Sequence, residues 1–97
     1  MATNDSRGGL EASLARVGLV TAFDFLVAAD SGYGAKPGPG MALAFAAAMG
    51  LEVGRLAVVG DATHDLEMAE RARYGLKVAV LSGTGAREDL ELHADIV

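Results

Sequence analysis

Residues 56–65 have the sequence LAVVGDATHD, and this stretch decides the fold class. The apolar run from Leu56 to Val59 does not alternate with polar residues, which is typical of an interior parallel strand covered on both faces. Asp61 follows at the carboxyl end of this strand, and a helix is expected over roughly 65–73, ending at Gly75. In parallel α/β sheets, ligands bind outside the carboxyl ends of the strands. The polar residues after this strand are therefore the first place to look for chemistry.

The rest of the chain continues the alternation of helices and strands. The hydrophobic spacing and the glycine stops predict a helix at 10–17 ended by Gly18, a strand at 23–29, a helix at 41–49 ended by Gly50, a strand at 77–81, a short acidic helix at 87–92 and a last strand from 95. Glycines 83 and 85 are expected to form a turn with positive φ. We therefore expect an α/β fold with a doubly wound parallel sheet, in one domain that spans residues 1–97.

Composition excludes several classes of protein. Hydrophobic residues make up 52% of the 97, which is too many for a disordered chain. No apolar run reaches the ~20 residues of a membrane span, and a net charge of −5 argues against a nucleic-acid partner. The chain has no cysteine, which excludes disulfides and thiolate zinc sites. The first residues do not resemble a secretory signal, so we expect a cytoplasmic location.

Three polar clusters follow predicted strands or loops: Thr3-Asn4-Asp5, Lys36-Pro37 and residues 60–65. Each has an ordinary structural interpretation when it is taken alone. The first can be a helix N-cap, the lysine can be a solvated side chain, and Asp61 with Asp65 can be a cap and a first-turn acid. The two histidines, His64 and His93, are expected at the surface.

Together, the clusters favour phosphate-ester chemistry with a divalent cation. Asp61 and Asp65 offer the carboxylate oxygens that Mg²⁺ prefers. Lys36 could neutralise charge on a phosphoryl group, and the hydroxyl of Thr3 with nearby backbone amides could orient a phosphate oxygen. Spacing alone does not supply the nucleophile.

The same segments carry a family resemblance that runs from end to end. The stretches ATNDSRGGLEASLARVGL, FDFLVAADSGYGAKPGPGM and LAVVGDATHDLEMAERAR resemble the second, third and fourth motifs of haloacid dehalogenase-like hydrolases. The tail VAVLSGTGAREDLELHADIV is similar to the segment that follows the fourth motif. Within that superfamily, the chain resembles the phosphoglycolate-phosphatase-like branch, whose members have a Rossmann-like core.

The resemblance implies a role for each motif residue. Thr3 would bind a phosphoryl oxygen with the Asn4 amide beside it, and Lys36 would pair with both the phosphoryl group and the nucleophile. Asp61 and Asp65 would hold Mg²⁺, and Gly60 would allow the turn that points Asp61 inward. The implied activity is hydrolysis of a small phosphorylated metabolite. A 2-haloacid dehalogenase is a lesser alternative. Dehalogenases of this family do not need a metal, so the presence of both Asp61 and Asp65 favours a phosphatase.

The chain also departs from the family pattern. The first motif, Asp-x-Asp on the central strand, supplies the nucleophile, and no Asp-x-Asp occurs in these 97 residues. The substrate-selecting cap, which precedes the second motif, is also missing. We therefore expect an inactive core with a slot about 10 Å wide where the nucleophile strand would pair. The alternative is a non-catalytic module that self-associates or binds a partner through the unpaired sheet edges.

Overall fold

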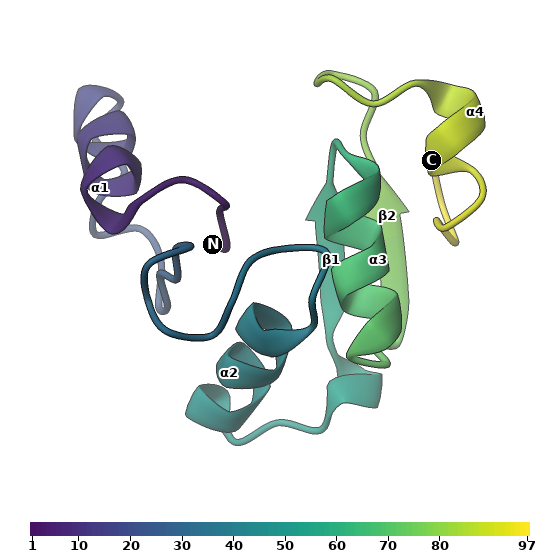
Figure 1. Cartoon of the computed structure of the whole chain (residues 1–97), viewed down its shortest axis with the longest axis horizontal. Coiled ribbons are helices and arrows are strands. Elements are labelled where there is room, and N and C mark those ends of the chain that lie inside the picture. Colours follow the sequence, from purple (N-terminus) through teal and green to yellow (C-terminus); the bar gives the residue numbers. More distant parts are fainter.

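A computed structural model describes all residues from 1 to 97 (Figure 1). In chain order, its elements are α1 (Arg7–Arg16), α2 (Gly40–Met49), the 3₁₀ turn η1 (Val53–Arg55), β1 (Ala57–Gly60), α3 (Thr63–Arg71), β2 (Leu76–Ala79) and α4 (Arg87–Leu90). None of these helices is long and apolar enough to cross a membrane. The predicted alternation of helices and strands is confirmed in the second half of the chain.

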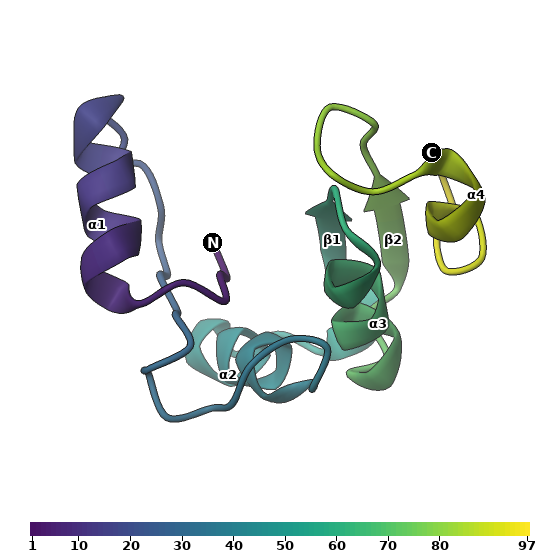
Figure 2. The ribbon, with the colours of Figure 1, turned by 45° about the horizontal axis from the view of Figure 1, so that its top comes forward.

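The sheet is parallel, as predicted, and is built around β1 and β2. Ala57 pairs with Leu76, and the register continues to Gly60 opposite Ala79. Beyond β2, Ile96 makes a single parallel bridge to Val78. A second parallel bridge joins Ala2 to Val27 on the other side of the molecule, and no hydrogen bond links it to β1. Figure 2 shows the N-terminal segment and β1 as two separate arms joined below by α2.

Two predicted strands are reduced to these single bridges. The segment 23–29 pairs only at Val27, whose N–H donates to Met1 O at 3.0 Å and whose carbonyl accepts from Thr3 N at 3.0 Å. Backbone hydrogen bonds also join Met1 N to Phe25 O at 2.8 Å and Ala29 N to Asp5 O at 3.0 Å, and after Asp5 the chain turns into α1, so only one bridge forms. The strand expected from residue 95 is likewise a single bridge at Ile96.

The helix boundaries follow local signals, but α1 begins at Arg7 rather than at residue 10, and α4 ends at Leu90 rather than at residue 92. Ser6 caps α1 by accepting a hydrogen bond from Gly9 N, and Gly50 ends α2 with φ of 66°. Helix α3 begins at Thr63 rather than at Asp65, and the residue with positive φ beyond its end is Arg73, not Gly75. A side chain at Gly75 would overlap the carbonyl of the 3₁₀ turn, so close approach is what requires glycine there.

Strand β1 is covered on one face only, which corrects the expectation of burial on both. Val58 packs on the buried clusters beside α3, whereas Ala57 is exposed and Val59 is 66% exposed. The alternation arises because successive side chains point to opposite faces of a strand. No element of the chain covers the face that carries Val59.

The core lies where α2 and α3 meet the strands. The larger cluster contains nine buried residues: Val27, Met41, Ala42, Ala46, Leu56, Met68, Ala69, Ala72 and Tyr74. Phe25 joins the N-terminal segment to this core through an edge-to-face contact with Phe45, at 5.8 Å between ring centres. A smaller cluster of Leu66, Ala79 and Leu90 fixes α4 against α3 and β2. The core therefore holds the two arms together through α2.

Candidate functional site

The strongest polar contact in the molecule joins Lys36 to Asp65. Lys36 Nζ lies 2.5 Å from Asp65 Oδ1, and the side chains are only 8% and 11% exposed. Lys36 comes from the turn before α2, and Asp65 comes from the first turn of α3. Two of the residues selected from the sequence are thus brought together across 29 residues of chain.

Asp65 is held by the beginning of its own helix. Its Oδ2 accepts a hydrogen bond from Ala62 N at 3.3 Å, as acids in a first turn commonly do. A Cβ on Gly60 would overlap the Asp65 side chain, and Gly60 has no positive φ. Glycine is therefore required at residue 60 by the close approach of Asp65, and not by a turn that needs positive φ.

The segment from Ala2 to Asn4 surrounds Lys36 from the other side. Ala2 O accepts from Lys36 Nζ at 3.0 Å, and the Asn4 side chain bonds to the Lys36 backbone. Thr3 lies between these two contacts, and its Oγ1 accepts a hydrogen bond from Asp5 N at 3.1 Å. The Thr3 hydroxyl proton and the Asn4 backbone N–H have no partner in the protein. Asn4, Lys36 and Asp65 are therefore joined by hydrogen bonds in one cluster, and Thr3 lies in the chain between the Ala2 and Asn4 contacts.

Asp61 is held by a different loop, which the sequence did not identify. Its Oδ2 accepts from Thr84 N at 3.2 Å, and its backbone carbonyl accepts from Gly85 N at 2.9 Å. A Cβ on Gly83 would overlap the Asp61 carboxylate. Neither Gly83 nor Gly85 has a positive φ, so the predicted reason for these glycines was wrong. Close packing around Asp61 is the reason that the structure gives.

The carboxylates have the donor chemistry of a magnesium site. Asp61 Oδ1 has no hydrogen-bond partner, and Asp65 shares its oxygens between Lys36 and Ala62 N. No group of three or more histidine or acidic side chains is clustered closely enough to hold a metal by itself. Asp61 and Asp65 offer the oxygen ligands that Mg²⁺ prefers, and a cation held by so few protein ligands keeps water or substrate oxygens among its ligands.

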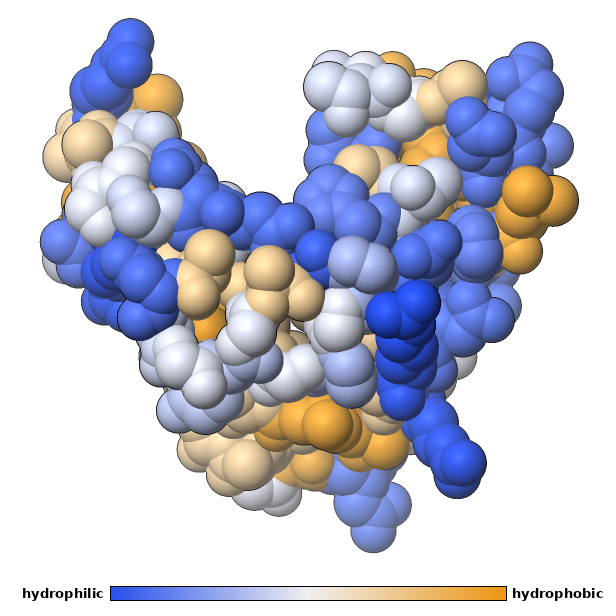
Figure 3. All heavy atoms as spheres, in the orientation of Figure 1, coloured by the Kyte–Doolittle hydropathy of each residue, from blue (hydrophilic) through white to orange (hydrophobic).

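An apolar groove of about 240 Å³ lies beside the Lys36–Asp65 pair. Its walls come from Met1 and Ala2 on one side and from residues 57–59 of β1 on the other, and Asp65 is its one residue that is not hydrophobic. The space-filling view shows the molecule hollowed between the two arms (Figure 3). This is the position where the sequence predicted an open slot between two strands.

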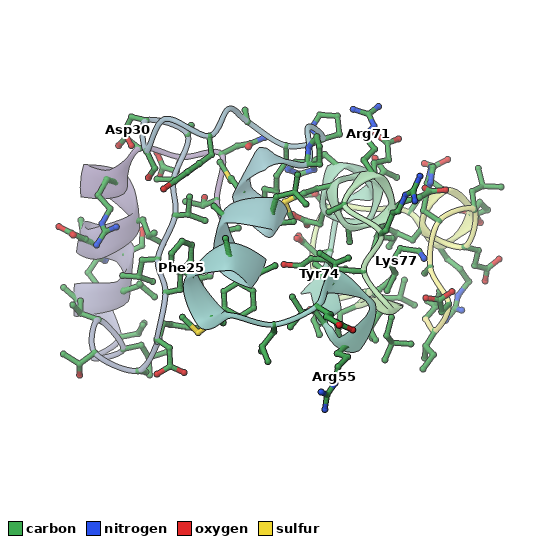
Figure 4. The ribbon with its side chains drawn as sticks, turned by 90° about the horizontal axis from the view of Figure 1, so that it is seen from below. Phe25, Asp30, Arg55, Arg71, Tyr74 and Lys77 are labelled. Atoms are coloured by element: carbon green, nitrogen blue, oxygen red, sulfur yellow. The ribbon has the colours of Figure 1, made fainter.

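Tyr74 closes the groove at its floor. Burial raises its pKa above the ordinary value of 10.0, and its hydroxyl donates to Ala42 O at 2.8 Å. In Figure 4, Tyr74 lies between α2 and the end of α3. This contact ties Tyr74, which follows α3, to α2 beside the groove.

The histidines lie closer to neighbours than predicted. His64 is half-buried in the first turn of α3 rather than exposed. His93 is 26% exposed, and its ring nitrogens lie 3.1 Å from Glu70 Oε2 and 3.6 Å from Glu67 Oε1. No hydrogen bond or ion pair joins either histidine side chain to Lys36, Asp61 or Asp65.

The sequence of this chain is similar to those of a known protein family. Residues 1–73 match the family model described as haloacid dehalogenase-like hydrolase. A curated relative, "Probable phosphatase IndB" of Dickeya dadantii, is 38% identical over 72 residues, which are 74% of this chain and 31% of the relative. The chain thus spans about a third of the length of this relative.

Solved structures agree in fold. A "putative beta-phosphoglucomutase" from Thermotoga maritima superposes with a TM-score of 0.85 at 24% identity, over 98% of this chain and 44% of that one. A "putative phosphoglycolate phosphatase" from Lactobacillus delbrueckii gives 0.80 at 24% identity, over 99% and 41%. The folds are therefore the same over less than half of either longer protein. With the match over residues 1–73 and the parallel α/β fold, these findings show that the chain belongs to the haloacid dehalogenase-like hydrolase family.

Proposed function

We propose that the protein to which these residues belong hydrolyses phosphate monoesters, and that this chain supplies the half of the active site that binds the phosphoryl group and the metal. The observation that carries this proposal is the buried Lys36–Asp65 pair, enclosed by the Ala2 carbonyl and the Asn4 side chain. A lysine beside a carboxylate at the carboxyl end of a parallel strand suits the charge of a transferring phosphoryl group.

Three hydrogen-bond donors in this cluster are free for an anion. Thr3 has its hydroxyl proton and Asn4 has its backbone N–H. Lys36 Nζ has three donors and uses two of them, on Ala2 O and Asp65 Oδ1. A phosphoryl group with several acceptor oxygens matches these donors better than a single carboxylate would. This supports a small phosphorylated metabolite as the substrate class, and we propose a cytoplasmic location for the reaction.

Asp61 and Asp65 are the residues that would hold Mg²⁺ in this proposal. When bound, the cation would neutralise charge on the phosphoryl oxygens. The loop at 83–85 supports this role because Thr84 N fixes one oxygen of Asp61 and leaves the other free. Lys36 already occupies one oxygen of Asp65, so we assign the direct contact to Asp61 and the more distant one to Asp65.

The 97-residue chain alone should have no phosphatase activity, because no Asp-x-Asp is present to supply a nucleophile. The test is hydrolysis of p-nitrophenyl phosphate with Mg²⁺, by the chain and by its Lys36→Ala variant. We expect both to stay at the background rate. Robust turnover that Lys36→Ala abolishes would mean that the chain carries its own nucleophile and that the assignment of roles is wrong.

A second candidate function rests on the groove. Val59 is 66% exposed on a strand with a free edge, and the apolar groove faces it. Exposed strand edges pair readily with other chains. The alternative is therefore a non-catalytic module that takes up an extended segment, from another copy of itself or from a partner. It is distinguished from the first candidate by its concentration-dependent assembly.

A further inference from the structure

The nitrogen and the oxygen of the Asn4 carboxamide both form hydrogen bonds with the backbone of Lys36. Nδ2 donates to Lys36 O at 3.0 Å, and Oδ1 accepts from Lys36 N at 2.7 Å. These bonds join residues that are 32 positions apart in the chain. A carboxamide carries a donor and an acceptor side by side, as this geometry needs. Aspartate lacks the donor, and glutamine is one methylene longer.

The Lys36 main chain makes no other hydrogen bond. The residue lies in a turn, outside any helix or strand, and its N–H and C=O have no partner besides Asn4. Two bonds hold the adjacent residues: Gly38 N donates to Ala35 O at 3.0 Å, and Arg71 Nη1 donates to Pro37 O at 3.3 Å. Asn4 therefore makes the only hydrogen bonds to the Lys36 N–H and C=O themselves, at the residue whose side chain reaches Asp65.

We propose that Asn4 is a positioning residue that holds Lys36 so that its ammonium group meets Asp65 and, on the proposed function above, the phosphoryl group of the substrate. The side chain of Asn4 acts through the Lys36 backbone, which is separate from the role of the Asn4 backbone N–H. This positioning role also explains how Lys36, which lies in an irregular turn, can make a buried ion pair. Without the carboxamide, the Lys36 N–H and C=O would have no hydrogen-bond partner in the protein.

The first measurement is hydrogen exchange of the Lys36 amide by NMR in the 97-residue chain. In Asn4→Ala, the Lys36 amide should exchange about tenfold faster, as expected when one hydrogen bond is lost. In Asn4→Asp, the acceptor for Lys36 N remains, so protection of this amide should be largely kept. Ser6→Ala is the matched control, because Ser6 lies two residues from Asn4 and its replacement removes a side-chain hydrogen bond from Gly9 N without touching Lys36.

The second measurement separates this proposal from the proposed function. Inorganic phosphate is titrated into the wild type, Asn4→Ala, Ser6→Ala and Lys36→Ala, and the affinity is followed by NMR. Asn4→Ala should bind phosphate about tenfold more weakly, Lys36→Ala should lose the binding, and Ser6→Ala should match the wild type. If the wild type binds no phosphate, the proposed function is contradicted, while amide exchange still decides the role of Asn4.

Two results would overturn the positioning role. One is an unchanged exchange rate of the Lys36 amide in Asn4→Ala, and the other is an equal acceleration in Ser6→Ala. If Asn4→Ala does not fold, Asn4→Asp decides: a Lys36 amide that exchanges there as fast as an unprotected amide would contradict the assigned acceptor.

Discussion

At the residue scale, the pair of Lys36 and Asp65 is both a stabilising contact and the centre of the proposed site. Removing one partner of a buried ion pair leaves the other charge without compensation. Lys36→Met should therefore lower the free energy of unfolding by about 3–5 kcal/mol. Urea denaturation followed by circular dichroism measures this, and Lys36→Met with Asp65→Leu should recover part of the loss.

The matched control for this pair is Arg87→Met. Arg87 and Glu91 form an exposed pair 3.3 Å apart, with side chains 54% and 53% exposed. Its loss should cost less than about 1 kcal/mol. Equal losses in Lys36→Met and Arg87→Met would mean that the Lys36 pair is an ordinary solvated contact.

Gly83 gives a second prediction at this scale. Because a Cβ there would meet the Asp61 carboxylate, Gly83→Ala should displace Asp61 and weaken Mg²⁺ binding by about tenfold or more. Gly8→Ala is the control, since a Cβ at Gly8 meets no atom within 4 Å. Isothermal titration with Mg²⁺ measures both, and an unaltered affinity in Gly83→Ala would remove the loop from the proposed site.

The sequence could nominate single residues but not their contacts. Thr3, Lys36, Asp61 and Asp65 were selected because their side-chain chemistry and order match a family pattern. The hydrogen bonds of Asn4 and the loop at 83–85 could not be predicted, since they join residues more than 20 positions apart through the backbone. A side chain that binds backbone atoms gives no periodic or motif signal.

At the element scale, Asp95 helps to hold the C-terminal segment beside β2. Asp95 Oδ2 accepts a hydrogen bond from Lys77 N at 2.8 Å, and this bond holds the pKa of Asp95 below its ordinary value of 3.8; the charge of Lys77 adds to the effect. The bond helps to align Ile96 beside β2, where Ile96 O accepts from Ala79 N.

This linkage predicts a pH dependence of the C-terminal segment. A depressed pKa in the folded state means that the ionised Asp95 stabilises the segment above its unfolded pKa, and that this stabilisation is lost as pH falls through the folded pKa. The Ala79 amide should therefore lose protection from exchange below about pH 4. In Asp95→Asn, this acid-dependent loss should shrink, whereas Asp24→Asn should behave like the wild type. An identical pH profile in Asp95→Asn would exclude Asp95 as the cause.

The elements that the sequence predicted well are those with strong local signals. Helix α2 ends at Gly50 and α1 is followed by Gly18, both with positive φ, because glycine adopts this conformation without strain. The strands at 23–29 and from 95 were overestimated because strand length depends on a partner elsewhere in the chain. Val27 and Ile96 each have only one such partner residue.

At the scale of the whole molecule, the open groove decides how the chain behaves in solution. It separates β1, whose edge on this side is unpaired, from the isolated bridge between Ala2 and Val27, and eleven of its twelve lining residues are hydrophobic. We therefore expect the mass measured by light scattering after size exclusion to rise with concentration. A stable monomer at every concentration would contradict this expectation.

Val59 is the residue through which this association can be tested. Val59→Lys places a charge in the groove and should weaken self-association at least about tenfold, as loss of one buried valine side chain implies. Leu92→Lys is the control, since Leu92 is 78% exposed and does not line the groove. Equal effects in the two variants would mean that association uses another surface.

The slot itself could be predicted because the family resemblance specifies which strand pairs between Ala2 and β1. The one-sided burial of β1 could not, because an apolar run predicts burial without saying whether a neighbour is present. The apolar side chain of Val59 lies on a face of β1 that no other part of these 97 residues covers.

The central claim is that Thr3, Lys36, Asp61 and Asp65 belong to one metal and phosphate site. The most direct test replaces Mg²⁺ by paramagnetic Mn²⁺, which has similar oxygen preference, and records amide spectra with inorganic phosphate present. The account predicts that amide signals of these four residues broaden together at low Mn²⁺, while those of Val17 and Leu92 stay sharp. Broadening centred on Glu67 and Glu70, or broadening of Asp61 without Thr3 and Lys36, would contradict it.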